Sequence, residues 1–278
     1  MKPDINFKRF IECPGIIDIH CHIFPDIIAE KAVSSIGKFY NLDLNCDGKT
    51  KSLLLAAQDA GITRSYVFST ATAISQVDSI NIFLSEQISR YPQLSAFGTL
   101  HPEQSAIEIN ETIGKMLELG LSGIKLHPDF QQIAADDAFV VEVCRQAKCL
   151  MPVLLHAGDP RYDFSHPAKI SRLAAMQPEC KIIAAHFGGW SQWQEAAEEL
   201  TGMQNVYVDT SSSFPFLNQN EILSLIEKFG TEKILFGSDF PMWNPIDELA
   251  MLSTLPISDE ELFRIVWFNS THLFELFK

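Results

Sequence analysis

The chain has 278 residues, of which 46% are hydrophobic and 20% charged, a composition typical of a globular protein with one large domain. Its formal net charge is −14, with no run of five like charges and no basic stripe, so binding to nucleic acid is not expected. The N-terminus lacks the apolar core of a signal peptide, no uncharged apolar stretch reaches 18 residues, and the six cysteines form no CxxC pair. We therefore expect a single domain over residues 1–278, located in the cytoplasm, with reduced thiols and no membrane association.

Eight short apolar runs recur along the chain, and several are continuous enough to predict strands buried on both faces. Between them lie stretches with apolar residues at helical spacing, such as 106–120. Eight strand–helix units in sequence predict an α/β protein with a (β/α)8 barrel, followed after about residue 245 by extra helices. An open, doubly wound sheet is the alternative, and the lack of a glycine-rich phosphate-binding motif disfavours it. The predicted strands are 16–20, 65–69, 95–100, 122–126, 152–156, 181–186, 206–209 and 234–237.

The first apolar run ends in two histidines one residue apart, His20 and His22. Because side chains alternate faces along a strand, both imidazoles point the same way and can bind one divalent cation together. Taken alone, the pair could equally be ordinary surface or core histidines. Four more histidines stand where an apolar run stops, and packing does not explain that distribution. They are His101, His127, His156 and His186.

Polar residues at the strand ends are expected to meet, because the carboxyl ends of all strands converge on one mouth of a barrel. Lys125, Asp209 and Asp239 stand at such positions beside the histidines. Three neutral imidazoles and a carboxylate suit Zn²⁺, Mn²⁺ or Fe²⁺, and water on such an ion ionises near neutral pH. We expect Asp239 to accept that proton and deliver it to the leaving group, while His186 polarises or binds the substrate.

Five motifs, in order along nearly the whole chain, resemble those of the amidohydrolase superfamily, and more narrowly its amidohydrolase-related branch of metal-dependent hydrolases. The terminal segment 268–274 is similar to the closing helix of that branch. The motifs are Ile17-Asp18-Ile19-His20-Cys21-His22, Gly123-Ile124-Lys125-Leu126-His127-Pro128, His156-Ala157-Gly158, Ala185-His186-Phe187-Gly188-Gly189 and Phe236-Gly237-Ser238-Asp239-Phe240-Pro241.

The resemblance implies a metal-dependent enzyme with Zn²⁺ as the ion expected first and Mn²⁺ or Fe²⁺ as alternatives. It implies that His186 is either a further ligand or an acid–base catalyst. One ion is expected rather than two, because four ligands already complete a single ion. The implied ligands are His20, His22, His156 and Asp239.

Lys125 leaves three roles open. In binuclear members of the superfamily a lysine on this strand is carboxylated and bridges two ions, and residues 125–128 are similar to the dihydroorotase version of that segment. The lysine can otherwise present an ammonium group to the substrate or form a structural ion pair. We expect an uncarboxylated lysine and a mononuclear site, because the narrower resemblance is to mononuclear members.

Several residues near strand ends are candidates for binding the substrate. Arg161 suits a substrate carboxylate, with a loop salt bridge as the alternative, and Trp190 is one of several aromatic residues expected around a pocket. The longest irregular connection, residues 38–52, is either a lid over the mouth or a surface excursion. His101 and His127 are expected behind the ligands rather than among them.

These features favour a hydrolase that acts on a small-molecule amide, lactone or ester through a metal-activated water. A metal-dependent, non-oxidative decarboxylase of an aromatic or unsaturated acid is the alternative, since the branch contains such enzymes. A barrel with a vestigial metal and a binding role is weaker, because every expected ligand type is present. A TatD-like nuclease is a further alternative, but it would have a glutamate in place of Lys125 and a less acidic surface. The expected partner is the small-molecule substrate, and the sequence also allows a homodimer.

Overall fold

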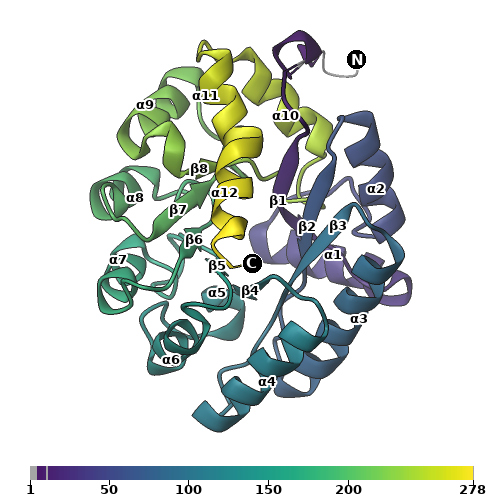
Figure 1. The fold of residues 1–278 in the computed structure, drawn as a ribbon, viewed down its shortest axis with the longest axis vertical. Helices are drawn as coiled ribbons and strands as arrows, with labels where there is room; N and C mark the ends of the chain where they lie inside the picture. Colours follow the sequence, from purple (N-terminus) through teal and green to yellow (C-terminus); the bar gives the residue numbers. More distant parts are fainter. Residues whose placement is uncertain (1–4, 11, 278) are drawn as a thin grey trace.

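The computed structural model describes residues 5–10 and 12–277, and its eight parallel strands form the predicted barrel (Figure 1). Each strand pairs with the next one along the chain. The ring closes where the segment after β8 meets β1: Ile19 N donates to Phe236 O at 2.9 Å, and Cys21 forms an isolated parallel bridge with Phe240. The strands are β1 Ile17–His22, β2 Arg64–Phe68, β3 Leu94–Gly98, β4 Gly123–Leu126, β5 Val153–Leu155, β6 Ile182–Ala184, β7 Val206–Asp209 and β8 Ile234–Leu235.

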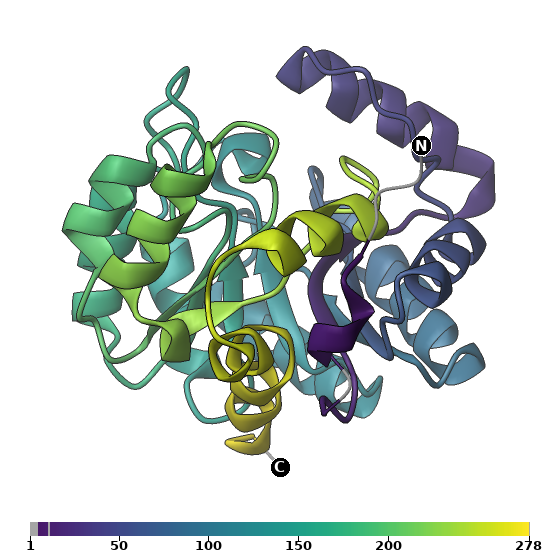
Figure 2. The ribbon, with the colours of Figure 1, turned by 90° about the horizontal axis from the view of Figure 1, so that it is seen from above.

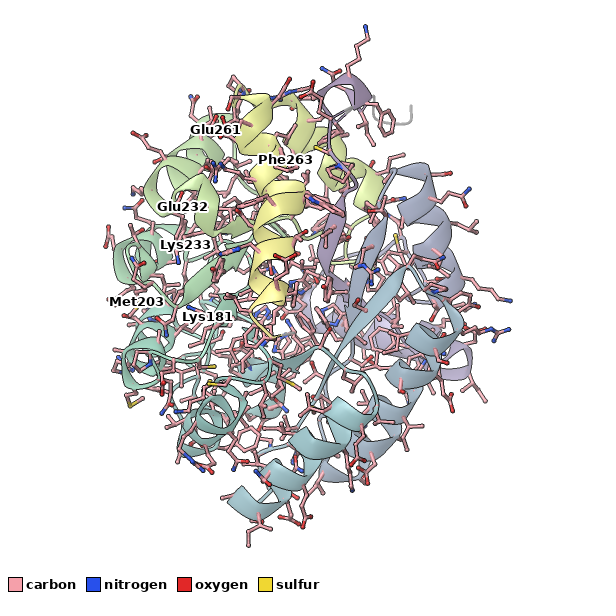
Figure 3. The ribbon with its side chains drawn as sticks, viewed as in Figure 1. Lys181, Met203, Glu232, Lys233, Glu261 and Phe263 are labelled. Carbon is pink, nitrogen blue, oxygen red and sulfur yellow. The ribbon has the colours of Figure 1, made fainter. Side chains whose placement is uncertain are left out.

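Helices surround the barrel, and three of them, α10 to α12, follow β8 as predicted (Figure 1). Local sequence fixes several helix starts: at α11 (Asp259–Phe263) the Ser258 hydroxyl accepts from Glu261 N at 3.2 Å, and the Glu261 carboxylate accepts from Ser258 N at 2.7 Å. Figure 3 labels Glu261 and Phe263 in this helix. No helix of the described residues is both long and apolar enough to cross a membrane. The helices are α1 Asp26–Tyr40, α2 Thr50–Asp59, α3 Val77–Arg90, α4 Ala106–Glu118, α5 Pro128–Gln131, α6 Ala138–Ala147, α7 Pro167–Met176, α8 Trp193–Leu200, α9 Gln219–Phe229, α10 Pro245–Thr254, α11 Asp259–Phe263 and α12 Asn269–Glu275.

The apolar strand sequences fill two separate cores. In β6, Ile182 and Ala184 pack in the layer between sheet and helices, whereas Ile183 packs in the barrel interior. The interior is closed at one end by α12, where Leu273 is fully buried and Phe274 stacks on Tyr66 with ring centroids 4.2 Å apart. Apolar side chains fill the end of the barrel beside α12, so the polar side chains of the strand ends gather at the opposite end.

A register shift in β1 aims the histidine pair at that opposite end, the mouth of the barrel. Ile17 and Ile19 belong to the interior core. The pairing of β1 with β2 then shifts between Asp18 and Cys21, and Cys21 packs in the outer core. An irregularity of this kind re-aims side chains, and it lets both His20 and His22 face the mouth.

Helix α1 lies on the mouth side of the barrel, at the end opposite α12 (Figure 2). The predicted irregular connection 38–52 is shorter than expected: α1 continues to Tyr40 and α2 begins at Thr50, so residues 41–49 form the loop. Residues of α1 reach the cavity at the mouth, including Ile36 and Tyr40. The segment therefore covers the mouth and is not a remote surface excursion.

Leu273→Ala should destabilise the fold by about 2–5 kcal/mol, because truncating a fully buried leucine loses burial and leaves a cavity at the closed end of the barrel. Leu276→Ala, three residues along the chain and 51% exposed, should change stability by no more than about 0.5 kcal/mol. Urea denaturation of both variants measures the difference. Equal losses would show that α12 does not close the barrel as described.

Candidate metal centre

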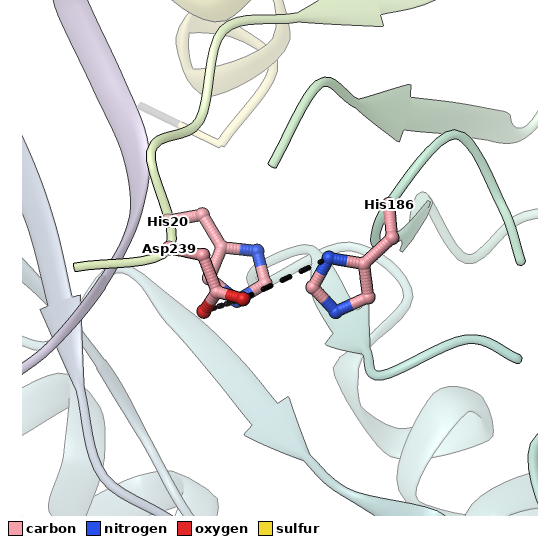
Figure 4. A group of neighbouring side chains, drawn as sticks. All are labelled: His20, His186 and Asp239. Atoms are coloured by element: carbon pink, nitrogen blue, oxygen red, sulfur yellow. Dashed lines mark ion pairs between the residues drawn. The ribbon is translucent and has the colours of Figure 1, made fainter. Parts of the chain in front are cut away.

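Three imidazoles, two from β1 and one from the turn after β6, lie near the carboxylate of Asp239. Figure 4 shows two of them, His20 and His186, beside that carboxylate. His20 Nε2 and His22 Nε2 lie 3.3 Å and 3.4 Å from its Oδ1, and His186 Nδ1 lies 4.0 Å from its Oδ2. His20, His186 and Asp239 are buried, while His22 faces the cavity. The ligand atoms of His20, His186 and Asp239 lie within 4.8 Å of one another, close enough to hold one ion.

Backbone geometry turns two of these side chains into the mouth. His186 lies two residues after the end of β6 and Asp239 four residues after the end of β8. They adopt φ of 60° and 61°, a left-handed conformation that non-glycine residues rarely take. Asp239 N donates to His20 O at 2.8 Å, which ties the turn after β8 to β1. Strained backbone of this kind persists where surrounding structure fixes it, commonly at functional sites. The turn at His186 also explains why β6 ends at Ala184, earlier than the predicted end at residue 186.

Asp209 holds His20 in one orientation. Its Oδ2 accepts a hydrogen bond from His20 Nδ1 at 2.8 Å, and its Oδ1 accepts from the backbone N–H groups of His186 and Ser211, each at 3.0 Å. With the hydrogen on Nδ1, the lone pair of His20 Nε2 faces Asp239, and within the described structure that nitrogen has no hydrogen-bond partner. Carboxylates commonly orient metal-binding histidines in this way.

The electrostatics of the group suit a cation. Burial lowers the pKa of His20 to about 4 and also lowers the pKa values of His22 and His186, so the imidazoles are neutral at pH 7. Burial alone would raise the pKa of Asp239, but the adjacent His20, His22 and His186 bring it far below its ordinary value. Neutral imidazole nitrogens and an ionised carboxylate are the donors that Zn²⁺ and similar ions take. The residues therefore fit a divalent metal.

His156 lies beside this group, within hydrogen-bond distance of His186. Its Nδ1 lies 3.0 Å from His186 Nε2, and its Nε2 faces Asp129 Oδ2 at 3.7 Å. Its ring stacks on that of His127, with centroids 3.9 Å apart. The predicted ligand role of His156 toward the first ion stays a prediction, and in this orientation His186 is the imidazole that faces Asp239.

Lys125 is fully buried on β4 and does not line the cavity. Its Nζ lies 4.8 Å from the centroid of the Phe68 ring and has neither a hydrogen bond nor an ion pair among the residues that the structure describes. Burial lowers its pKa to about 8, although Asp239 and Asp209 oppose the shift. The structural ion pair is therefore not seen, while the bridging and substrate-facing roles stay predictions.

The cavity at the mouth is lined by polar and by apolar side chains, and the space open to water is about 30 Å³. We call the apolar lining, which includes Ile36 and Tyr40 of α1, the cover. Trp190 lines it, as the sequence suggested for an aromatic pocket. Arg161 does not line it: its guanidinium contacts both oxygens of Asp159, at 2.9 Å and 2.6 Å, and donates to Phe39 O. This is the loop salt bridge, and it disfavours the substrate-binding role. The polar lining is His22, His127, His156, His186, Ser212 and Asp239, and the apolar lining is Ile36, Tyr40, Leu42, Phe130, Trp190, Pro241 and Met242.

Sequence reasoning missed two contributors to this cavity. Ser212 donates its hydroxyl hydrogen to Asp239 Oδ2 and accepts from Trp243 Nε1 at 2.8 Å. The run of three serines, residues 211–213, close after β7 is a signal for it. Tyr40 was missed because α1 crosses the mouth from a distance that spacing along the chain does not reveal. Its hydroxyl lies 3.0 Å from His127 Nε2.

His20→Ala or His22→Ala should remove the tightly held ion and the activity together, because each deletes a neutral imidazole beside Asp239. The protein as purified should retain about one ion per chain through desalting. Elemental analysis before and after substitution measures both values. A fully active His20→Ala protein without bound metal would contradict this assignment.

Comparisons with known proteins identify the family. A family model described as amidohydrolase matches residues 17–276. No curated protein sequence gives a match. Among solved structures, uncharacterized TIM-barrel protein Bb4693 from Bordetella bronchiseptica is 17% identical, with a TM-score of 0.80 over 94% of this chain and 98% of that one. Dihydroxybenzoic acid decarboxylase from Polaromonas sp. JS666, with bound manganese and 2-nitroresorcinol, is 18% identical, with a TM-score of 0.73 over 95% and 98%.

A candidate 2-pyrone-4,6-dicarboxylic acid hydrolase from Pseudomonas putida is also similar, with 18% identity and a TM-score of 0.65 over 94% of this chain and 98% of that one. At these identities the solved structures support the barrel fold alone. The family model covers nearly the whole chain, strand ends and closing helix included. The chain is a member of the amidohydrolase family.

Proposed function

We propose that the protein is a metal-dependent hydrolase that cleaves a small lactone, ester or amide. The observation that carries the proposal is the ionised Asp239 carboxylate among three neutral imidazoles, facing a cavity at the mouth of the barrel. His20, His22 and Asp239 would hold the ion, with His186 or His156 as the remaining ligand. Zn²⁺ is our first choice, and manganese is the ion bound by one of the similar decarboxylases.

A divalent ion in this position would lower the pKa of water and polarise the bond to be cleaved. Asp239 is the residue that takes the proton from the attacking water and passes it to the leaving atom. Ser212 donates a hydrogen bond to Asp239 Oδ2 and keeps that carboxylate oriented. Asp209 does the same for His20, so that neither side chain must reorganise during the reaction.

The cavity lining limits the class of substrate. Among the described residues it contains no arginine or lysine, and its cover is apolar and largely aromatic. A second carboxylate on the substrate would find no counter-charge there, which favours an uncharged or singly charged molecule with an apolar or aromatic part. Because ordinary ligand pockets span about 300–1,000 Å³, the cover formed by α1 has to move before a substrate of that size enters.

A non-oxidative decarboxylase is the second candidate, and the aromatic cover together with the likeness to dihydroxybenzoate decarboxylases supports it. In that reaction the substrate carboxylate leaves as CO₂, and a proton replaces it on the same carbon. Asp239 or His186 would then serve as the proton donor instead of activating water. The apolar lining suits either reaction.

Isotope labelling separates the two reactions. A panel of lactones, esters, amides and aromatic carboxylates is incubated with the metal-loaded enzyme in H₂¹⁸O and, separately, in D₂O. We expect one ¹⁸O atom in the acid product and no CO₂. Release of CO₂, with deuterium on the carbon that lost it, would replace the hydrolase assignment with the decarboxylase.

Asp239→Asn should keep the fold, because the side chains have nearly the same shape, and lower kcat by roughly 10²–10⁴-fold through loss of the proton acceptor. His186→Ala should also lower kcat, with less loss of metal than His20→Ala. Asp163→Asn, at a carboxylate that is 77% exposed, is the matched control and should leave kcat unchanged. If His186→Ala lost metal as completely as His20→Ala, His186 would be a ligand and not a catalyst.

A further inference from the structure

Residues 24–49, which we call the flap, leave the barrel and return to it at one point. Phe24 forms an isolated parallel bridge with Lys49, and Phe24 N donates to Gly48 O at 2.9 Å. Between these residues the chain runs out along α1 and comes back through the loop 41–49. Few side chains hold α1 down, since the buried residues among its fifteen are Ala29, Val33 and Gly37. The flap is therefore built to turn as one piece about its paired ends.

Arg161 fastens the far end of the flap, where α1 ends, to the loop after β5. Its guanidinium donates to Phe39 O of α1 and also to both carboxylate oxygens of Asp159, at 2.9 Å and 2.6 Å. The Asp159 side chain is fully buried, so it is a fixed partner within that loop. The guanidinium also lies 4.6 Å from the centroid of the Phe39 ring. One side chain thus joins both the backbone and the ring of a flap residue to the barrel.

The next residue of α1, Tyr40, makes a second and weaker contact with the barrel. Burial holds the pKa of His127 well below its ordinary range, so this ring is neutral and carries one hydrogen. His127 Nδ1 accepts from Phe130 N at 3.3 Å, which leaves that hydrogen on Nε2. His127 Nε2 therefore donates to the Tyr40 hydroxyl oxygen, at 3.0 Å. A hydrogen bond between neutral groups is weaker than one that involves a charge.

We propose that Arg161 is a latch that keeps the flap closed over the mouth, and that its release opens the cavity. Ile36, Tyr40 and Leu42 of the flap line that cavity, where the space open to water is about 30 Å³. Turning the flap away removes these side chains and exposes the polar lining beneath them. The admission of a substrate by this movement rests on the proposed function, whereas the latch itself does not.

A thiol on the barrel side of the cavity tests the latch without any substrate. Ser212 lines the cavity and is 4% exposed, so Ser212→Cys places a reporter thiol that N-ethylmaleimide reaches when the flap opens. Mass spectrometry of peptides gives the labelling rate of each thiol separately. Exposed Cys149 supplies the rate of a free thiol in the same sample, and buried Cys144 and Cys180 stay unlabelled while the barrel is folded.

In the reporter protein, Arg161→Lys should raise the labelling rate of the reporter thiol by about 10-fold or more, the value of a hydrogen bond to a charged group. Lysine keeps a positive charge beside Asp159, but its single ammonium group does not reach both carboxylate oxygens and Phe39 O together. Tyr40→Phe should raise the rate by about 2–10-fold. Arg172→Lys, at an ion pair with Asp136, is the matched control and should leave the rate unchanged.

Equal labelling of the reporter thiol with Arg161 and with Arg161→Lys would overturn the latch. A reporter thiol that reacts as fast as Cys149 while Arg161 is intact would also overturn it, because the flap would already be open. Faster labelling of Cys144 and Cys180 in Arg161→Lys would assign the effect to unfolding and count against the latch. Release of CO₂ in the isotope experiment changes the proposed function alone, so the two failures are distinguishable.

Discussion

The hydrogen bond between His20 and Asp209 is the contact on which the candidate site depends. It joins β1 to β7 in a fully buried position, at 2.8 Å, and it fixes which nitrogen of His20 faces the mouth. The same carboxylate accepts from the backbone N–H of His186, so one side chain organises the ends of β1, β6 and β7. Burial raises the pKa of Asp209, but His20, His186 and Ser211 lower it far below the ordinary value, and the carboxylate stays ionised. The hydrogen bond between Asp209 and His20 thereby holds in place the imidazoles that lie around Asp239.

Most of the fold could be predicted because the strands of a barrel are nearly continuous apolar runs. Ile182, Ile183 and Ala184 show the reason: both faces are buried, so the sequence carries no polar interruption until the strand ends. The polar residues then appear near those ends, which is why the sequence alone predicts that His20 and Asp239 lie close together, as they do. The family resemblance added the roles of these residues.

The orientation of individual rings could not be predicted in the same way. His156 was expected beside Asp239, but its position depends on the hydrogen bond to His186 and on stacking with His127, which no spacing encodes. His186 enters the group because of its left-handed backbone. Arg161 was a candidate for the substrate, whereas an acidic neighbour two residues away occupies its guanidinium. Tyr40 comes from a helix that crosses the mouth from outside the strand pattern.

Helix α1 contacts both the histidines at the mouth and the cavity beside them. The Tyr40 hydroxyl lies 3.0 Å from His127 Nε2, Ile36 of the same helix lines the cavity, and the space open to water is about 30 Å³. Under the proposed function, entry of a substrate of ordinary size therefore requires a movement of this helix. Under the same proposal, the apolar lining favours substrates without a second charge.

Anomalous diffraction at the absorption edge of the metal, from crystals of the protein as purified, tests the central claim most directly. The account predicts a strong peak within about 2.0–2.3 Å of His20 Nε2 and of an Asp239 carboxylate oxygen, with His22 beside it. An anomalous map with no peak between His20 and Asp239, in crystals that contain one tightly bound ion per chain, would contradict it.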